Sequence, residues 1–249
     1  MNELAYSNTA VVVGASRGLG RGIASAFAQA GTRVIATART AAALSDLAGT
    51  SPNIRTEVAD ATDASVAARV IDRHQPNTVV LVAGANPTIG SLQAQTWETF
   101  SVNWHTDVRI AFHWLRAALL QPLRPDSRVV VISSGAAVAG SPLSGGYAGA
   151  KATQRFITAY AQDESNRDGL NISFTAVLPR LTPLTDLGRP AVHAYAARSG
   201  QTEEEYVRQL GEPLTPQAAG AAVVKLVSED ATNLRPAYLL TGAGLQSLP

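Results

Sequence analysis

The sequence predicts an α/β fold in which helices cover both faces of a doubly wound, seven-stranded parallel sheet. Short runs rich in β-branched residues recur along the chain, and most are apolar at consecutive positions instead of alternating with polar ones. That pattern is typical of strands buried on both faces. Helical patterns fill the gaps between the runs, and right-handed connections then place successive strands in parallel.

Each expected element follows from these local patterns. The strands are residues 10–13, 33–37, 54–58, 79–82, 128–132, 172–177 and 237–240. The helices between and after them are residues 20–30, 41–47, 64–73, 96–120, 146–167 and 216–228. Because strands and helices alternate without a break, residues 1–249 are predicted to form a single domain.

One segment departs from the alternation. Residues 182–216 carry four prolines and three glycines around a short amphipathic stretch, and they follow an expected strand. An insertion at the carboxyl end of a strand is well placed to cover a ligand bound in the crevice of the sheet. An ordinary long connection explains the composition equally well.

Composition and charge exclude several classes of function. The chain is 46% hydrophobic and 16% charged, which is typical of a folded protein with a large core. Its formal charge of +1 is spread without a basic stripe or polybasic tail, so neither nucleic acid nor a membrane surface is an expected partner. The N-terminus shows no signal pattern and the apolar runs are too short to span a bilayer, so a cytoplasmic location is expected.

The residues available for chemistry are also limited. The chain has no cysteine, which excludes disulfides, thiolate nucleophiles and cysteine zinc sites. None of the four histidines stands in a metal-binding pattern, so no metal is expected. Any redox chemistry must therefore come from a bound cofactor.

A glycine-rich turn lies between the first expected strand and the first helix. It reads Gly14-Ala15-Ser16-Arg17-Gly18-Leu19-Gly20. Glycines here let a diphosphate approach the backbone N–H groups at the helix N-terminus, which favours dinucleotide binding over a purely structural turn. The same residues also match the elbow of a hydrolase with Ser16 as nucleophile, but only 13 residues precede the turn, too few for the earlier strands that such an elbow needs.

The strongest chemical signal is Tyr147-Ala148-Gly149-Ala150-Lys151 at the start of an expected helix. The i, i+4 spacing puts the phenol and the ammonium on one face. A neighbouring ammonium stabilises a phenolate, so the phenol can exchange protons near neutral pH. The alternative is a surface tyrosine that stacks on the aliphatic part of the lysine.

Together, Gly14-x-x-x-Gly18-x-Gly20 and Tyr147-x-x-x-Lys151 resemble the short-chain dehydrogenase/reductase family, and the likeness extends over essentially the whole chain. The resemblance implies a Rossmann-type fold. It also implies that Ser134 hydrogen-bonds the substrate oxygen, that Asn103 supports a water-linked proton relay to the lysine, and that Asp60 binds the adenine amino group. Alone, Ser134 could be a strand-end cap and Asn103 a polar residue that bends a helix.

The implied reaction is hydride transfer between the nicotinamide and a carbonyl or secondary alcohol carbon, with Tyr147 as general acid and base. Lys151 would also hold the nicotinamide ribose, and Thr182 would contact the carboxamide. The expected cofactor contacts are Gly14, Ser16, Arg17, Gly18, Leu19, Gly20, Arg39, Thr40, Asp60, Ala61, Ala83, Gly84, Ala85, Tyr147, Lys151, Pro179 and Thr182.

Some positions depart from the family pattern. Val13 replaces a threonine, and Leu81-Val82 replaces an Asn-Asn pair before Ala83-Gly84, so altered hydrogen bonding is expected there. Arg180 follows Pro179 where relatives have glycine. Its side chain either binds an acidic substrate or points into solvent, and the second interpretation is favoured.

The choice of cofactor rests on residues 38–40. An acidic residue expected there for NAD is absent, since the segment reads Ala38-Arg39-Thr40. Arg39 and Arg17 are instead suited to pair with a 2′-phosphate, which predicts NADP(H). The alternative is that one or both arginines are solvated surface charges.

The leading hypothesis is an NADP(H)-dependent carbonyl reductase or alcohol dehydrogenase acting on a small or medium apolar substrate. The alternative from another class is a noncatalytic NADP(H) sensor that kept the fold, although a sensor needs no proton relay. By analogy with relatives that pair helices matching residues 96–120 and 146–167, a homodimer or homotetramer is expected.

Overall fold

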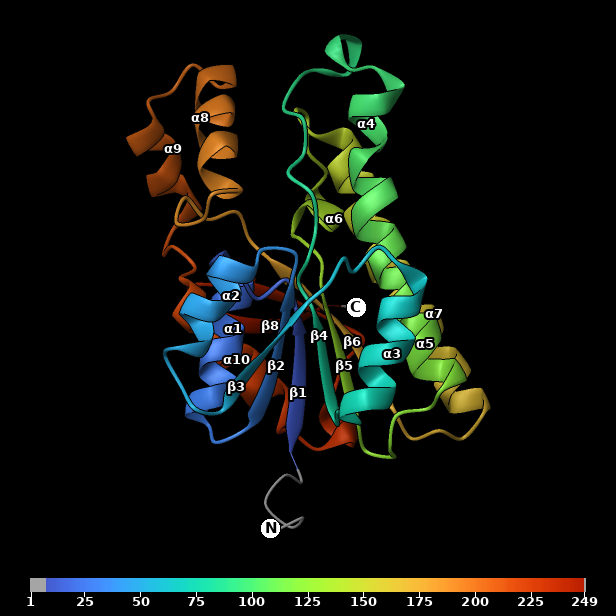
Figure 1. The fold of residues 1–249 in the computed structure, drawn as a ribbon. Coiled ribbons are helices and arrows are strands. Elements are labelled where there is room, and N and C mark those ends of the chain that lie inside the picture. Colours follow the sequence, from blue (N-terminus) through green and yellow to red (C-terminus); the bar gives the residue numbers. More distant parts are fainter. Residues whose placement is uncertain (1–7, 249) are drawn as a thin grey trace.

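The computed structural model describes residues 8–248. Its centre is one eight-stranded sheet in the order β3-β2-β1-β4-β5-β6-β7-β8 (Figure 1). The strands are β1 (Thr9–Val13), β2 (Arg33–Ala38), β3 (Ile54–Val58), β4 (Thr78–Leu81), β5 (Arg128–Ile132), β6 (Ser173–Pro179), β7 (Ala237–Thr241) and β8 (Gly244–Leu248). The order reverses between β1 and β4, which is where a doubly wound sheet opens a crevice at its carboxyl edge.

Two layers of helices enclose the sheet (Figure 1). One face carries α1 (Gly18–Gln29), α2 (Ala41–Ala48) and α10 (Pro216–Val227), and the other carries α3 (Ala64–His74), α5 (Arg109–Leu120) and α7 (Gly145–Arg167). The arrangement confirms the predicted α/β fold. The helices beyond the strand ends are α4 (Trp97–Asn103), α6 (Ala136–Ala139), α8 (Gly188–Arg198) and α9 (Glu203–Leu210).

The apolar strands divide their side chains between two cores. In β1, Ala10 and Val12 pack with α1 and α10, whereas Val11 and Val13 pack with α3 and α5. All four are at most 1% exposed. Successive side chains of a strand point to opposite faces, so an uninterrupted apolar run is what a sheet covered on both sides requires.

The structure differs from the prediction at the end of the sheet. An eighth strand, β8, pairs with β7 in the antiparallel direction through a tight turn at Thr241–Gly244. The sequence prediction of seven parallel strands missed it because residues 244–248 read Gly-Leu-Gln-Ser-Leu, a half-exposed edge strand without a β-branched run.

The long helix predicted for residues 96–120 is interrupted. It consists of α4, a π-turn η3 (Trp104–Val108) and α5. Insertions of this type are frequent at functional sites because they change the direction of the side chains that follow. Residues 182–216 contain α8 and α9, which lie beyond the carboxyl ends of the strands (Figure 1).

Candidate active site

A large cavity, of about 1200 Å³, opens at the carboxyl edge of the sheet. Its walls come from the loops after β1, β2, β3, β4, β5 and β6, and from residues of α8 and α9. Tyr147, Lys151 and Ser134 all line it, although they come from two different elements. This is the position at which open α/β sheets bind ligands.

The glycine turn after β1 forms one end of the cavity. Gly14 has a positive φ of 94°, and a Cβ at this position would lie 2.5 Å from the backbone nitrogen of Ala83. A Cβ on Gly20 would lie 2.1 Å from the carbonyl oxygen of Gly14. The turn therefore requires glycine at both positions, and it brings the N-terminus of α1 to the cavity without side chains in between.

Helix α7 holds the tyrosine and the lysine. Ser133, at the end of β5, donates a hydrogen bond of 2.7 Å to the carbonyl of Lys151, which fixes the first turns of α7 to the sheet. Tyr147 is half-buried in the cavity wall, and Nζ of Lys151 lies 5.5 Å from the centre of its ring. The phenol and the ammonium therefore face the same space, as the i, i+4 spacing predicts.

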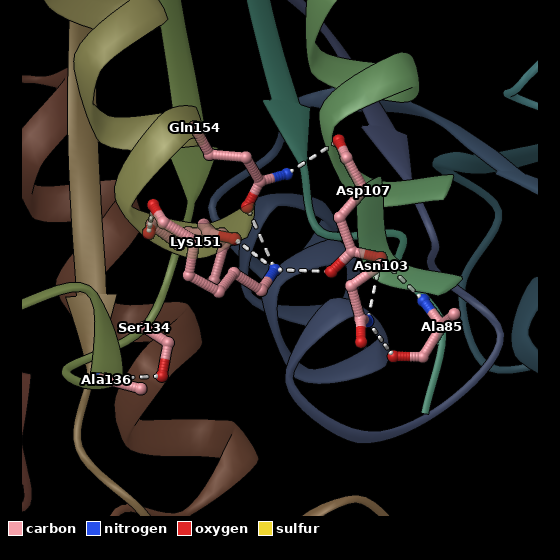
Figure 2. A network of polar contacts seen from close by, with 9 residues as sticks. Ala85, Asn103, Asp107, Ser134, Ala136, Lys151 and Gln154 are labelled. Carbon is pink, nitrogen blue, oxygen red and sulfur yellow. Dashed lines mark hydrogen bonds and ion pairs between the residues drawn. The ribbon is translucent and has the colours of Figure 1, made fainter. Parts of the chain in front are cut away.

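The ammonium of Lys151 is buried, and its partners come from the protein (Figure 2). Nζ lies 3.1 Å from Oδ2 of Asp107, and it donates to Oε1 of Gln154 at 3.0 Å and to the carbonyl of Ile132 at 3.4 Å. Burial lowers the pKa of Lys151, but the charge of Asp107 and then that of Tyr147 oppose it. The pKa therefore lies above its ordinary value.

Asn103 does not line the cavity, unlike the other three expected catalytic residues. Its side chain is 1% exposed and donates to the carbonyl of Ala85 at 2.8 Å and to Oδ1 of Asp107 at 3.3 Å. Figure 2 shows Asn103 beside Asp107, which in turn faces Lys151. Asn103 is thus connected to the lysine through a carboxylate.

Ser134 stands at the end of β5 with its hydroxyl in the cavity wall. Its Oγ accepts a hydrogen bond of 3.2 Å from the backbone of Ala136, at the start of α6 (Figure 2). This contact is that of a strand-end cap, and it leaves the hydroxyl proton free to donate to a ligand. The two interpretations of this residue are compatible.

The expected cofactor residues gather around the same space. All 17 of them line the cavity: Gly14, Ser16, Arg17, Gly18, Leu19, Gly20, Arg39, Thr40, Asp60, Ala61, Ala83, Gly84, Ala85, Tyr147, Lys151, Pro179 and Thr182. Turn glycines lie at one end and Tyr147 lies on the wall from α7. A cavity of this size with the glycine turn in its wall can hold a dinucleotide.

Three charged residues surround the glycine-turn end of the cavity: Arg17 in the turn itself, Arg39 after β2 and Asp60 after β3. Arg39 is exposed, and Arg17 lies 3.8 Å from Asp186 with both side chains 63% exposed. Asp60 accepts hydrogen bonds from the backbone and hydroxyl of Thr62, and these, aided by the charge of Arg39, hold its pKa below the ordinary value. Arg17, Arg39 and Asp60 all line the cavity.

The loop after β6 carries Thr182 and Arg180. Thr182 is 4% exposed and donates from Oγ1 to the carbonyl of Leu214 at 2.8 Å, which connects the two ends of segment 182–216. Arg180 is exposed yet lines the cavity, and its charge acts on Tyr206 in α9. Tyr195 and Tyr206 stack at 6.2 Å between ring centroids, so α8 and α9 contribute an aromatic wall.

Sequence reasoning missed Asp107 and Gln154. Gln154 also donates at 2.9 Å from Nε2 to the carbonyl of Asp107, which connects α7 to η3. The one local signal is the spacing, because Asp107 follows Asn103 by four residues and both therefore belong to one face of the expected helix. The π-turn that aims its side chain at the lysine has no comparable signature.

Comparison with known proteins identifies the family. The family model for the short chain dehydrogenase matches residues 8–196. The chain belongs to the short-chain dehydrogenase family. Members of this family are oxidoreductases that use nicotinamide cofactors and act on small molecules. The part of the chain that matches the family model includes the glycine turn, Tyr147 and Lys151.

Solved structures share the fold of this short-chain dehydrogenase. A short chain dehydrogenase from Mycobacterium avium has a TM-score of 0.78 at 19% identity, over 99% of this chain and 86% of its own. A single-residue variant of the actinorhodin polyketide ketoreductase with NADPH has a TM-score of 0.80 at 21% identity, over 95% of this chain and 97% of its own. No match was found among the curated proteins.

Two further features of this short-chain dehydrogenase concern membranes and metals. Within residues 8–248, no helix is both long and apolar enough to cross a bilayer. In the same part of the chain, no three His, Asp or Glu side chains are grouped as metal ligands. His74 is hydrogen-bonded to Glu57, and His193 is hydrogen-bonded to Glu203. Neither pair includes Ser16, whereas a hydrolase with Ser16 as nucleophile would need a base beside it.

Proposed function

We propose that this short-chain dehydrogenase transfers a hydride between NADP(H) and a carbonyl or secondary alcohol substrate, with Tyr147 as general acid and base. The proposal rests on one observation: Tyr147, Lys151 and Ser134 line the same cavity as the glycine turn. A noncatalytic binding protein would need the turn but not the three polar side chains at the other end.

The residues present fit a nicotinamide dinucleotide. Gly14 and Gly20 allow the tight turn, since a Cβ at either position would meet protein backbone, and the turn leads into the N-terminus of α1, where a diphosphate can be bound. Asp60, Arg17 and Arg39 line the same cavity. In the proposal Asp60 would bind the adenine amino group, and the two arginines would pair with a 2′-phosphate. Thr182 and Lys151 would hold the nicotinamide end. The bound dinucleotide would supply or accept the hydride.

The chain itself would manage the substrate oxygen and its proton. During reduction, Ser134 donates a hydrogen bond to the carbonyl oxygen and Tyr147 donates its phenolic proton to the same oxygen as it becomes an alcohol. In the oxidative direction, the phenolate of Tyr147 removes that proton. The ammonium of Lys151 stabilises the phenolate in both directions, because it lies 5.5 Å from the ring.

The substrate end of the cavity favours a mostly apolar molecule. Besides Tyr195 and Tyr206, its apolar lining is formed by Ile89, Val138, Leu187, Ala191, Leu210, Leu239 and Leu248, while Ser141, Ser144, Arg180 and Arg198 add polar groups. Arg180 is exposed and also lines the cavity. We propose that α8 and α9 cover the substrate and that residues 8–248 act as one domain.

The test is NADPH consumption with a panel of ketones and aldehydes. Tyr147→Phe should lower kcat/KM by at least about a hundredfold, because general acid catalysis typically contributes that much. Tyr160→Phe is the matched control, since Tyr160 is on the same helix but 57% exposed and outside the cavity. NADPH binding without turnover, or a rate that Tyr147→Phe leaves unchanged, would instead support the sensor.

A further inference from the structure

Asp107 is the charged group closest to the proposed machinery that the mechanism does not yet use. Its side chain is 0% exposed, in the π-turn η3 between α4 and α5. Burial of a lone carboxylate is strongly unfavourable, so a carboxylate at this depth must be paired. Its charged partner is Lys151, at 3.1 Å.

Both oxygens of Asp107 have separate roles (Figure 2). Oδ2 faces Nζ of Lys151, whereas Oδ1 accepts from the backbone of Ala85 at 2.8 Å and from Nδ2 of Asn103 at 3.3 Å. The carboxylate therefore connects the loop after β4, the end of α4 and the lysine of α7. A change at Asp107 reaches three walls of the cavity at once.

The ammonium of Lys151 has three N–H donors and three acceptors within reach. These are Asp107, Gln154 and the carbonyl of Ile132, at 3.1, 3.0 and 3.4 Å. Of the three, only Asp107 carries a negative charge. The titratable groups that act on Lys151 are Asp107 from η3 and Tyr147 from α7. The remaining neighbours are neutral amides and carbonyls.

We propose that Asp107 is a positioning residue of the reaction, whose carboxylate keeps the Lys151 ammonium charged and fixed beside the Tyr147 phenol. The effect on the reaction rests on the proposed function, in which Tyr147 is the general acid and base. Without the carboxylate, a fully buried lysine loses its proton readily, because burial disfavours the charged form. Tyr147 would then lose the positive neighbour that stabilises its phenolate.

Asp107→Asn removes the charge and keeps the shape. We expect the Tyr147 phenolate to form less readily, because the positive charge that stabilises it would be lost. The phenolate is followed by ultraviolet difference absorbance, with Tyr147→Phe as the blank. The acid limb of alcohol oxidation should move to higher pH, and the rate near neutral pH should fall about tenfold.

Two further variants separate charge from structure. Asp107→Asn/Gln154→Glu returns a carboxylate to a position whose native oxygen lies 3.0 Å from Nζ, so the phenolate should form again near the wild-type pH. Glu57→Gln is the matched control. It makes the same acid-to-amide change in a side chain that is 11% exposed, paired with Arg69, Arg73 and His74, and outside the cavity. It should leave the phenolate titration unchanged.

A measurement on the unmodified protein covers the case in which Asp107→Asn does not fold. The chain contains two lysines, Lys151 and the exposed Lys225, so carbon-13 labelling of lysine Cε gives one signal from each. The Lys151 signal should keep the shift of an ammonium throughout the neutral range. A neutral amine at that pH would overturn the proposal.

The two titrations require neither cofactor nor substrate. A phenolate titration that Asp107→Asn leaves in place, or that the double variant fails to restore, would refute the role of Asp107 even in an active enzyme. If Asp107→Asn shifts the phenolate titration but the unmodified protein reduces none of the ketones and aldehydes, the role of Asp107 stands and only the proposed hydride transfer is rejected.

Discussion

At the scale of single residues, the arginines beside the glycine turn determine the expected choice of cofactor. Arg39 is exposed at the end of β2, and Arg17 is only loosely paired with Asp186 at 3.8 Å. Such an exposed, distant pair does not satisfy a guanidinium fully. Both side chains are therefore available to a 2′-phosphate, which NADP carries and NAD lacks.

Replacement of Arg39 should show this preference directly. Arg39→Ala is expected to weaken NADPH binding about tenfold or more, because a hydrogen bond to a charged group contributes roughly 1.5–3 kcal/mol, while NADH binding should change little. Isothermal titration of both cofactors measures the difference. Arg55→Ala, an exposed arginine outside the cavity, is the control. Tighter binding of NAD than of NADP to the unmodified protein would contradict the prediction.

Sequence reasoning at this scale found the residues whose spacing is local. Tyr147 and Lys151 are four positions apart on one helix, and the glycines of the turn lie within seven residues. The contacts of Asp107 and Gln154 could not be predicted in the same way. They depend on how the π-turn orients Asp107 toward a helix that follows much later in the chain.

At the scale of elements, the pair α1 and α10 depends on close contact between backbones. A Cβ on Gly220 would lie 2.4 Å from the carbonyl of Gly22 and 2.7 Å from Cβ of Ala26. The two helices therefore pack at a distance that only glycine permits. Because α1 begins in the glycine turn, this contact also supports one end of the cavity.

Gly220→Ala should destabilise the fold. The expected loss is about 1–3 kcal/mol in the free energy of unfolding, as for other over-packed contacts. Urea denaturation measures it. Gly49→Ala is the control, since its Cβ would meet nothing closer than 3.4 Å and its φ is −62°. Equal stability of the two variants would show that the helices can separate without cost.

Most elements could be predicted because their apolar patterns are continuous. The strand predicted at residues 54–58 has the bounds of β3, and the helix predicted at residues 146–167 differs from α7 by one residue. The misses were β8, α6, the break in the helix of residues 96–120, and the helices α8 and α9, which the sequence indicated only as a short amphipathic stretch. The patterns of β8 and α6 are short and weak, and neighbouring elements stabilise both.

At the scale of the whole molecule, one face of helices is unusually apolar. Large exposed side chains on α4, η3, α5 and α7 are Trp97, Trp104, Phe112, Phe156 and Tyr160, with exposures of 40–69%. Helix α7 packs against the other three elements, so these side chains belong to one helical layer. Extended apolar surface of this kind marks interfaces between proteins.

We propose that this layer pairs two copies of the chain. Phe156→Glu should then convert an oligomer to a monomer, because a buried charge would face an apolar partner. Light scattering after size-exclusion chromatography measures the mass. Leu92→Glu, which places the same charge on a residue 75% exposed outside these helices, should leave the mass unchanged. A monomeric unmodified protein would refute the pairing.

The edge strand β8 has a practical consequence for anyone who handles the protein. It returns from the turn after β7 so that Leu248 becomes part of the cavity wall. An affinity tag or fluorescent fusion attached after this residue would therefore begin beside the cavity. The start of β1 lies at the opposite edge of the sheet, so a fusion partner joined ahead of that strand would begin away from the cavity.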